Sequence, residues 1–188
     1  GSAFFAVMAG YYALTTTYSL YLKRRIVVDI CVLAGLYTVR IVAGGAATGI
    51  PLSVWLLAFS IFFFLSLAAV KRQAELVDNV KQGKLKASGR GYHVTDLPII
   101  SMISIGAGYV AALVMMFYVN SPAVMQLYTY PEALLGVCAI LLYWITRTVM
   151  LAHRGAMHDD PIIYAAKDRI SQICFLIILA FVLAGAVL

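Results

Sequence analysis

The chain has 188 residues, of which 63% are hydrophobic and 12% are charged. A soluble domain averages about 45–50% apolar and about 25% charged residues, so this composition excludes an ordinary soluble domain and predicts an all-α, polytopic membrane helix bundle. The net charge of +6 is not gathered in a basic domain with interleaved aromatic residues, which argues against nucleic-acid binding.

Apolar runs near the ~20 residues that a bilayer requires follow one another along the whole chain. They predict six transmembrane helices, at Ala3–Leu22, Ile26–Thr48, Leu52–Val70, Leu97–Val119, Pro131–Met150 and Ile170–Leu188. The first, third and fifth connections carry most of the charged residues, and the second and fourth carry almost none. The positive-inside rule therefore predicts that the first, third and fifth connections are cytoplasmic.

Short polar stretches flank the second predicted span on its cytoplasmic side. Tyr18, Lys23 and Asp29 belong to the first connection or its edges, where a belt of interfacial tyrosines and inside cations is the simpler interpretation. Arg40 lies eleven residues past Asp29, roughly 16 Å deeper at 1.5 Å per residue. An arginine at this depth indicates a functional or polar-cavity site, with a structural ion pair to a neighbouring helix as the alternative.

The third connection begins with a regular pattern of charges. Lys71, Glu75 and Asp78 are spaced i, i+4, i+7, so they share one face if the helix continues, and Arg72 reaches Glu75 at i+3. A carboxylate between cations suits a magnesium–pyrophosphate complex. The alternative is an ordinary amphipathic helix end stabilised by charge pairs.

Other polar features carry weaker signals. The segment from Lys81 to His93 is basic and glycine-rich, and fits either a cover over an anionic substrate or a solvated linker. His158, Asp159 and Asp160 are interpreted as a solvated loop, with Pro161 starting a helix. Two glycine pairs, Gly106 with Gly108 and Gly44 with Gly45, are expected to let helices pack closely.

Several stretches resemble the UbiA superfamily of intramembrane prenyltransferases. They are Tyr18-Ser19-Leu20-Tyr21-Leu22-Lys23, Val28-Asp29-Ile30 and Tyr37-Thr38-Val39-Arg40-Ile41-Val42-Ala43-Gly44-Gly45. Ser53-Val54-Trp55 followed by Lys71-Arg72-Gln73-Ala74-Glu75-Leu76 is similar to the decaprenyl-phosphate phosphoribosyltransferase branch. The resemblance runs along most of the chain and is strongest from Tyr18 to Glu75.

The resemblance implies nine spans around a central cavity with a cytoplasmic mouth, in the inner membrane of a bacterium. Members of the branch transfer 5-phosphoribose from phosphoribosyl pyrophosphate to a polyprenyl phosphate and release pyrophosphate with Mg²⁺, supplying precursors of cell-surface glycans. Residues 1–188 would then be the last six spans of nine, and residues 71–96 the cytoplasmic loop at the mouth. The N-D-x-x-D motif of the family is absent from these residues, so we expect them alone to be inactive.

The resemblance also implies site residues. Lys71, Arg72 and Glu75 fall on the second polar motif, with a cation where prenyl-donor enzymes have the first Asp. Lys71 and Glu75 are the implied catalytic residues, and Glu75 the implied metal ligand. Tyr18 and Lys23 fall on the first turn, and by position we add Asp29, Arg40 and Tyr92 as substrate-binding residues.

Other functions stay open at this point. One is a prenyltransferase of the same fold that acts on an aromatic or quinone precursor. Another class is a lipid-linked sugar flippase or transporter with a pocket around Arg40, although no internal repeat is evident. A scaffold subunit is a further alternative, and the oligomeric state, a homo-oligomer included, is left undetermined.

Overall fold

The computed structural model describes residues 2–86, 89–158 and 160–187, and the elements in these ranges are helical. The long helices are α1 (Ser2–Leu20), α2 (Val28–Thr48), α3 (Val54–Lys81), α4 (Leu97–Val119), α6 (Leu134–His153) and α8 (Arg169–Val187). The short elements are α5 (Pro122–Leu127), α7 (Pro161–Lys167) and the 3-10 turns η1 (Leu22–Arg24), η2 (Val94–Asp96) and η3 (Pro131–Ala133). The prediction of an all-α membrane helix bundle is confirmed.

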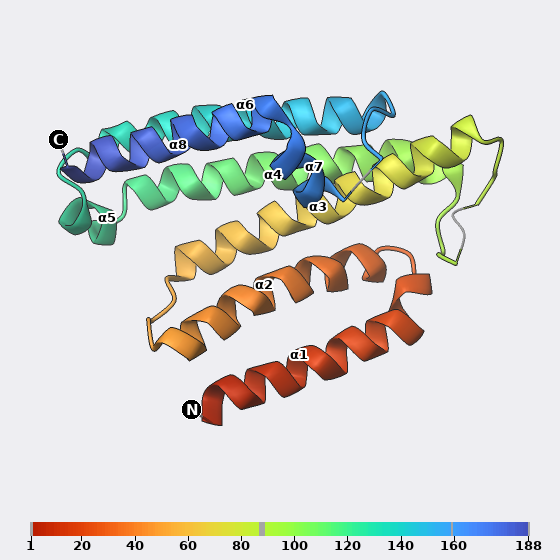
Figure 1. Ribbon diagram of the computed structural model, residues 1–188, viewed down its shortest axis with the longest axis horizontal. Coiled ribbons are helices and arrows are strands. Elements are labelled where there is room, and N and C mark those ends of the chain that lie inside the picture. Colours follow the sequence, from red (N-terminus) through yellow and green to blue (C-terminus); the bar gives the residue numbers. More distant parts are fainter. Residues whose placement is uncertain (1, 87–88, 159, 188) are drawn as a thin grey trace.

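The long helices run roughly side by side, so their connections gather at two ends of the bundle (Figure 1). The α1–α2, α3–α4 and α6–α7 connections lie at one end, which we call the charged end. The α2–α3 turn, α5 and the C-terminus lie at the opposite end (Figure 1). The alternation of charged and uncharged connections in the sequence thus corresponds to two distinct ends of the molecule.

Within the described ranges, five helical segments are long and apolar enough to cross a membrane, and the chain is that of an integral membrane protein. They span Val28–Thr48, Val54–Lys81, Val94–Val119, Pro131–His153 and Arg169–Ala186. The first predicted span, Ala3–Leu22, forms α1, which is not among these five segments. Its second half carries three consecutive threonines, Thr15 to Thr17, among tyrosines, which lowers its mean hydropathy.

Helix α3 continues well beyond the end of the predicted third span at Val70. Residues Lys71 to Lys81 are helical, so the prediction of a loop over residues 71–96 is wrong in its first part. The extension is amphipathic: Ala74 packs with Val149 and Met157, whereas Leu76 packs beside Tyr92. Because other segments cover the extension at both Ala74 and Leu76, α3 stays helical past the apolar run that ends at Val70.

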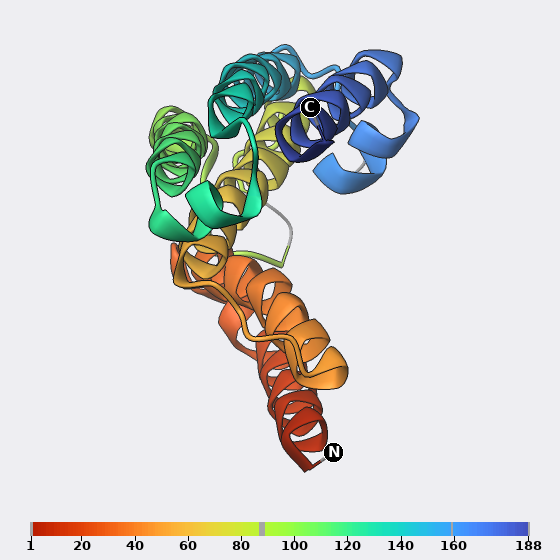
Figure 2. The same ribbon diagram turned by 90° about the vertical axis from the view of Figure 1, so that its left-hand side faces the viewer.

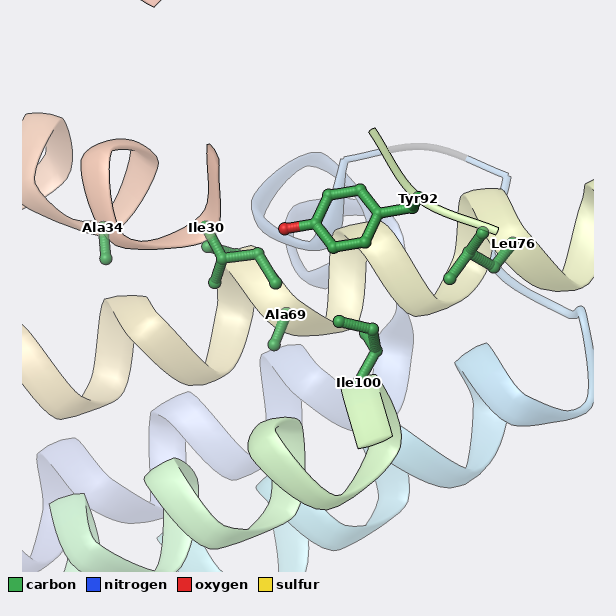
Figure 3. Packing of buried hydrophobic residues seen from close by; sticks show 7 residues of the cluster. Ile30, Ala34, Ala69, Leu76, Tyr92 and Ile100 are labelled. Atoms are coloured by element: carbon green, nitrogen blue, oxygen red, sulfur yellow. The ribbon is translucent and has the colours of Figure 1, made fainter. Parts of the chain in front are cut away.

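Helix α3 also joins the two arms of the molecule. Helices α1 and α2 form one arm, and α4, α6 and α8 form the other (Figure 2). At the charged end the junction is filled by the cluster around Ile30, Ala69 and Ile100, from α2, α3 and α4, together with Tyr92 of the α3–α4 loop (Figure 3). Beside this junction, polar side chains of α2, α3 and the start of α7 meet.

Candidate functional site

Asp29, in the first turn of α2, has a fully buried carboxylate that contacts three other segments. The Tyr18 hydroxyl of α1 donates a hydrogen bond to its Oδ1 at 2.8 Å, and Arg90 Nη1, from the α3–α4 loop, donates to the same atom at 2.9 Å. Arg72 Nε of α3 lies 2.8 Å from Oδ2, close enough for an ion pair but not aligned as a hydrogen bond. Asp29 therefore ties the α1–α2 turn to α3 and to the loop.

Glu75 completes this cluster from the next turn of α3. Its Oε2 accepts a hydrogen bond from Arg72 and lies 3.2 Å from Arg90 Nε. Two arginines thus share two carboxylates, so the four formal charges cancel. This group, Asp29, Arg72, Glu75 and Arg90, is called the charge cluster below, and because it is neutral it has no surplus charge to attract an anion.

Tyr92 and Arg90 hold the α3–α4 loop against the charge cluster. The Tyr92 hydroxyl accepts a hydrogen bond from Val27 N at 3.0 Å, and its ring lies 5.8 Å from the Arg72 guanidinium carbon. Burial raises the pKa of Tyr92 to about 12, so the phenol stays neutral. Burial lowers the pKa of Arg90, but Glu75, Tyr18 and Asp29 outweigh this effect and raise it above its ordinary value.

A second polar group lies beside the charge cluster, on the side of α3 that faces α7. Lys71 Nζ is 2.7 Å from Asp160 Oδ2, and the Tyr37 hydroxyl of α2 donates to the same oxygen at 3.5 Å. Asp160 Oδ1 accepts a hydrogen bond from Ile162 N and so caps α7. One carboxylate therefore links α2, α3 and α7.

A small pocket opens next to this link, which we call the polar pocket. Its volume is about 90 Å³, and it is lined by Lys71, Ala74, Glu75, Asp78, Met157, His158 and Asp160. Lys71 and Asp160 neutralise each other, and Glu75 is paired within the charge cluster. Within the described part of the chain, His158 is the one ion-pair partner of Asp78, with 3.7 Å between His158 Nδ1 and Asp78 Oδ2, so its carboxylate is the least engaged in the pocket.

The donor set fits Mg²⁺ only as a partner of a phosphate ligand. Among the residues that the structure describes, no group of three or more His, Cys, Asp or Glu side chains is placed to hold a metal. Mg²⁺ commonly binds through one or two carboxylates, with water and substrate phosphates as its other ligands. Asp78 is better suited than Glu75, the ligand expected from the sequence, because one Glu75 oxygen already contacts two arginines.

The structure places the predicted site residues in four different settings. Asp29, Arg72 and Tyr92 are buried and offer no surface to a substrate, and Tyr18 supports them. Lys71 and Glu75 line the polar pocket. Arg40 lies apart from both groups, against Tyr11 and Tyr37. Lys23 lies in η1 and has no hydrogen bond or ion pair within the described ranges.

Two residues of the site were missed by the sequence analysis. Asp160 was assigned to a solvated loop; its position just before Pro161 is the signal of an N-terminal cap, but its partner Lys71 is 89 residues away. Arg90 stood out only as one of several loop cations. The neighbouring Gly91 indicates that the loop packs closely on η1, because a Cβ at residue 91 would collide with the backbone of Arg24. Asp159 lies outside the described residues.

A larger, apolar pocket of about 530 Å³ lies between α3, α6, α7 and α8. Phe63, Trp144 and Phe175 are among its lining residues. Its polar lining is slight: Trp144 Nε1 donates to Ser171 Oγ at 2.9 Å. The pocket therefore suits a hydrocarbon group, and it is separate from the polar pocket on α3.

Comparison with known proteins gives relatives along nearly the whole chain, although no protein-family model matches it. Nodulation protein NoeC of Azorhizobium caulinodans is 38% identical over 176 residues, covering 94% of this chain and 57% of that protein. An uncharacterized protein, y4nM, of Sinorhizobium fredii is 38% identical over 187 residues, covering 96% of this chain and 36% of that protein.

A third relative has a name that describes an activity. The decaprenyl-phosphate phosphoribosyltransferase of Mycolicibacterium smegmatis is 32% identical over 174 residues, covering 90% of this chain and 54% of that protein. The chain thus spans about half the length of this relative and of NoeC. Through these relatives, the chain is related to the UbiA-type prenyltransferases, and within them to the decaprenyl-phosphate phosphoribosyltransferases.

Proposed function

We propose that the protein transfers a 5-phosphoribosyl group from phosphoribosyl pyrophosphate to a polyprenyl phosphate. The observation that carries this proposal is the polar pocket. It places Lys71, Asp78 and Asp160 together at the charged end of a membrane bundle, in a chain related to proteins named for this transfer. A membrane protein that joins a water-soluble phosphate to a lipid needs such a polar opening beside apolar helices.

In the proposed reaction an oxygen of the lipid phosphate attacks the anomeric carbon of the ribose. The bond from that carbon to the pyrophosphate oxygen breaks, and its electron pair leaves with pyrophosphate. A phosphate monoester dianion is already nucleophilic, so no strong general base is required. Lys71 would bind the departing pyrophosphate, exchanging its ion pair with Asp160 for a substrate oxygen.

Asp78 would hold the Mg²⁺ that accompanies the pyrophosphate, with Glu75 one turn away. The ion would neutralise charge on the leaving group. The charge cluster beneath fixes the α3 turn that carries Lys71 and Glu75, because Arg72 is clamped by carboxylates from two segments. The apolar pocket between α6 and α8 would accommodate part of the isoprenoid tail.

The transfer is tested with the full-length protein in detergent, supplied with radiolabelled phosphoribosyl pyrophosphate, polyprenyl phosphate and Mg²⁺. Label is expected in the organic phase, and Lys71→Ala should remove most of it. Lys84→Ala is the matched control, since this lysine is exposed and, among the described residues, its side chain donates a hydrogen bond to Gln82 alone. Transfer to an aromatic acceptor from a polyprenyl diphosphate, without transfer of ribose, would contradict the proposal.

A further inference from the structure

Arg40 is a cation inside a membrane helix without a carboxylate partner. It lies in α2, where its side chain is exposed, and no ion pair to it exists within residues 2–86, 89–158 and 160–187. Two other arginines in the membrane-spanning segments, Arg72 and Arg147, are each paired with an aspartate. An unpaired arginine within a bilayer costs at least ~2.5 kcal/mol on insertion scales, so a cation in this position requires an anion or a polar cavity.

Two tyrosines hold the Arg40 guanidinium in a fixed orientation. Its Nε and Nη2 donate hydrogen bonds to the Tyr11 hydroxyl at 3.1 and 2.8 Å. Its central carbon lies 5.6 Å from the Tyr11 ring centroid and 5.2 Å from that of Tyr37. Both tyrosines are neutral, so they position the charge without cancelling it. Arg40 Nη1 has no hydrogen bond within the described part of the chain.

Tyr37 connects Arg40 with residues that line the polar pocket. Arg40 follows Tyr37 by three residues, which is roughly 4.5 Å along the helix axis. The hydroxyl of Tyr37 reaches Asp160, which pairs with Lys71. Tyr37 therefore contacts both the unpaired cation inside the bilayer and Asp160 of the pocket that would hold the pyrophosphate group.

We propose that Arg40, oriented by Tyr11 and Tyr37, binds the phosphate monoester of the lipid acceptor. This inference rests on the proposed transfer, in which the lipid is the substrate that arrives from within the membrane. A guanidinium suits a phosphate because its fork of N–H donors matches two phosphate oxygens. Bound there, the phosphate supplies the missing countercharge, and Tyr37 links this site to residues of the polar pocket.

The test compares equilibrium binding of tritiated undecaprenyl phosphate with that of undecaprenol, which has the same tail and no phosphate. The full-length protein is used in detergent, as wild type, Arg40→Gln and Arg40→Lys. Arg25→Gln is the matched control: Arg25 also stacks on a tyrosine, Tyr21, and donates to its hydroxyl, but it lies outside the membrane helices. Inorganic phosphate is added as a competitor in a separate series.

We expect wild type to prefer the phosphate lipid, and Arg40→Gln to lose that preference by roughly tenfold to a hundredfold, the range of a charge-assisted hydrogen bond. Arg40→Lys should retain part of it, and Arg25→Gln should behave as wild type. Inorganic phosphate should compete only weakly; equal competition would mean that the site takes soluble phosphate, which would overturn the inference.

Two further outcomes would also overturn it. One is unchanged preference in Arg40→Gln. The other is equal loss of both lipids with a lower melting temperature, which would assign Arg40 to an ion pair within the protein. The result separates this inference from the proposed function: lipid-phosphate binding that depends on Arg40 without ribosyl transfer contradicts only the transfer. Transfer by Arg40→Gln with an unchanged KM for the lipid contradicts only the site.

Discussion

Asp29 and Arg72 form an ion pair in which neither side chain is accessible to solvent, with 2.8 Å between Asp29 Oδ2 and Arg72 Nε. The pair joins the first turn of α2 to α3 at the charged end. Removing one member of a buried pair leaves the other charge uncompensated in a medium of low dielectric constant, which costs about 3–5 kcal/mol. The pair is therefore a structural requirement of the site.

Asp29→Asn should lower the stability of the protein strongly, because Arg72 and Arg90 would each lose a carboxylate. A fall of several degrees in the melting temperature in detergent is expected, measured by intrinsic fluorescence. Glu132→Gln is the control, since Glu132 is exposed and has no ion pair among the described residues. Equal melting temperatures for Asp29→Asn and the control would refute this role.

Arg90→Gln should loosen the α3–α4 loop without unfolding the bundle. Arg90 is the loop residue that contacts both carboxylates of the charge cluster, while Tyr92 holds the same loop through Val27. Hydrogen exchange of the amides at residues 89–93 should become faster, whereas exchange in α4 and α6 should not change. Uniformly faster exchange along the chain would instead show that Arg90 supports the whole fold.

Gly108→Ala should destabilise the contact between α4 and α6. A Cβ at residue 108 would lie 2.9 Å from Ser66 Oγ and would also collide with Ile145, and overpacking of this kind costs about 1–3 kcal/mol. Gly106→Ala is the matched control on the same helix, because a Cβ there meets nothing within 4 Å. A lower melting temperature is expected for the first variant alone; equal effects would contradict the packing assignment.

Asp168 should contribute to stability in a pH-dependent way. Burial opposes its ionisation, but hydrogen bonds from Arg147 and Ser171 outweigh burial and lower its pKa below the ordinary value of 3.8. A lowered folded-state pKa gives stability that is fully present above the ordinary value and is lost as the pH falls through the folded-state value. The advantage of wild type over Asp168→Asn should therefore shrink below about pH 4.

Melting temperatures of both proteins across pH 3 to 7 would check this prediction. The Arg147–Asp168 pair links α6 to the start of α8, with Arg147 Nη1 2.7 Å and Nη2 3.1 Å from the two carboxylate oxygens. A difference between the proteins that stays constant over the whole range would mean that ionisation of Asp168 adds nothing.

The sequence predicts most of the helices because an apolar run of membrane length has one stable form in lipid, a helix with its backbone bonds satisfied internally. It underestimates α3, because the apolar residues after Val70 are spread around the helix and become significant only when α4, α6 and the loop cover them. Close packing at glycines is also hard to foresee. Gly45 and Gly108 lie against neighbours, but Gly44 and Gly106 have no neighbouring atom within 4 Å of a Cβ position.

The site is predicted less completely than the fold. The i, i+4, i+7 pattern identifies Lys71, Glu75 and Asp78 because they share a helix and their spacing is local. The partners of these residues come from distant segments, and only the docking of helices decides which carboxylate meets which cation. For this reason Asp160 and Arg90 are evident in the structure but could not be singled out in the sequence.

The turn between α1 and α2 has a consequence for the order of folding. Val27 has a φ of 65°, which is unfavourable for a β-branched residue, and α2 has no side-chain cap of its own at this end. The groups that complete the turn are supplied from later in the chain: Arg72 reaches Asp29, and the Tyr92 hydroxyl binds Val27 N across 65 residues. During synthesis the α1–α2 hairpin can enter the membrane, but its turn reaches its final form only after α3 and the following loop have emerged from the ribosome.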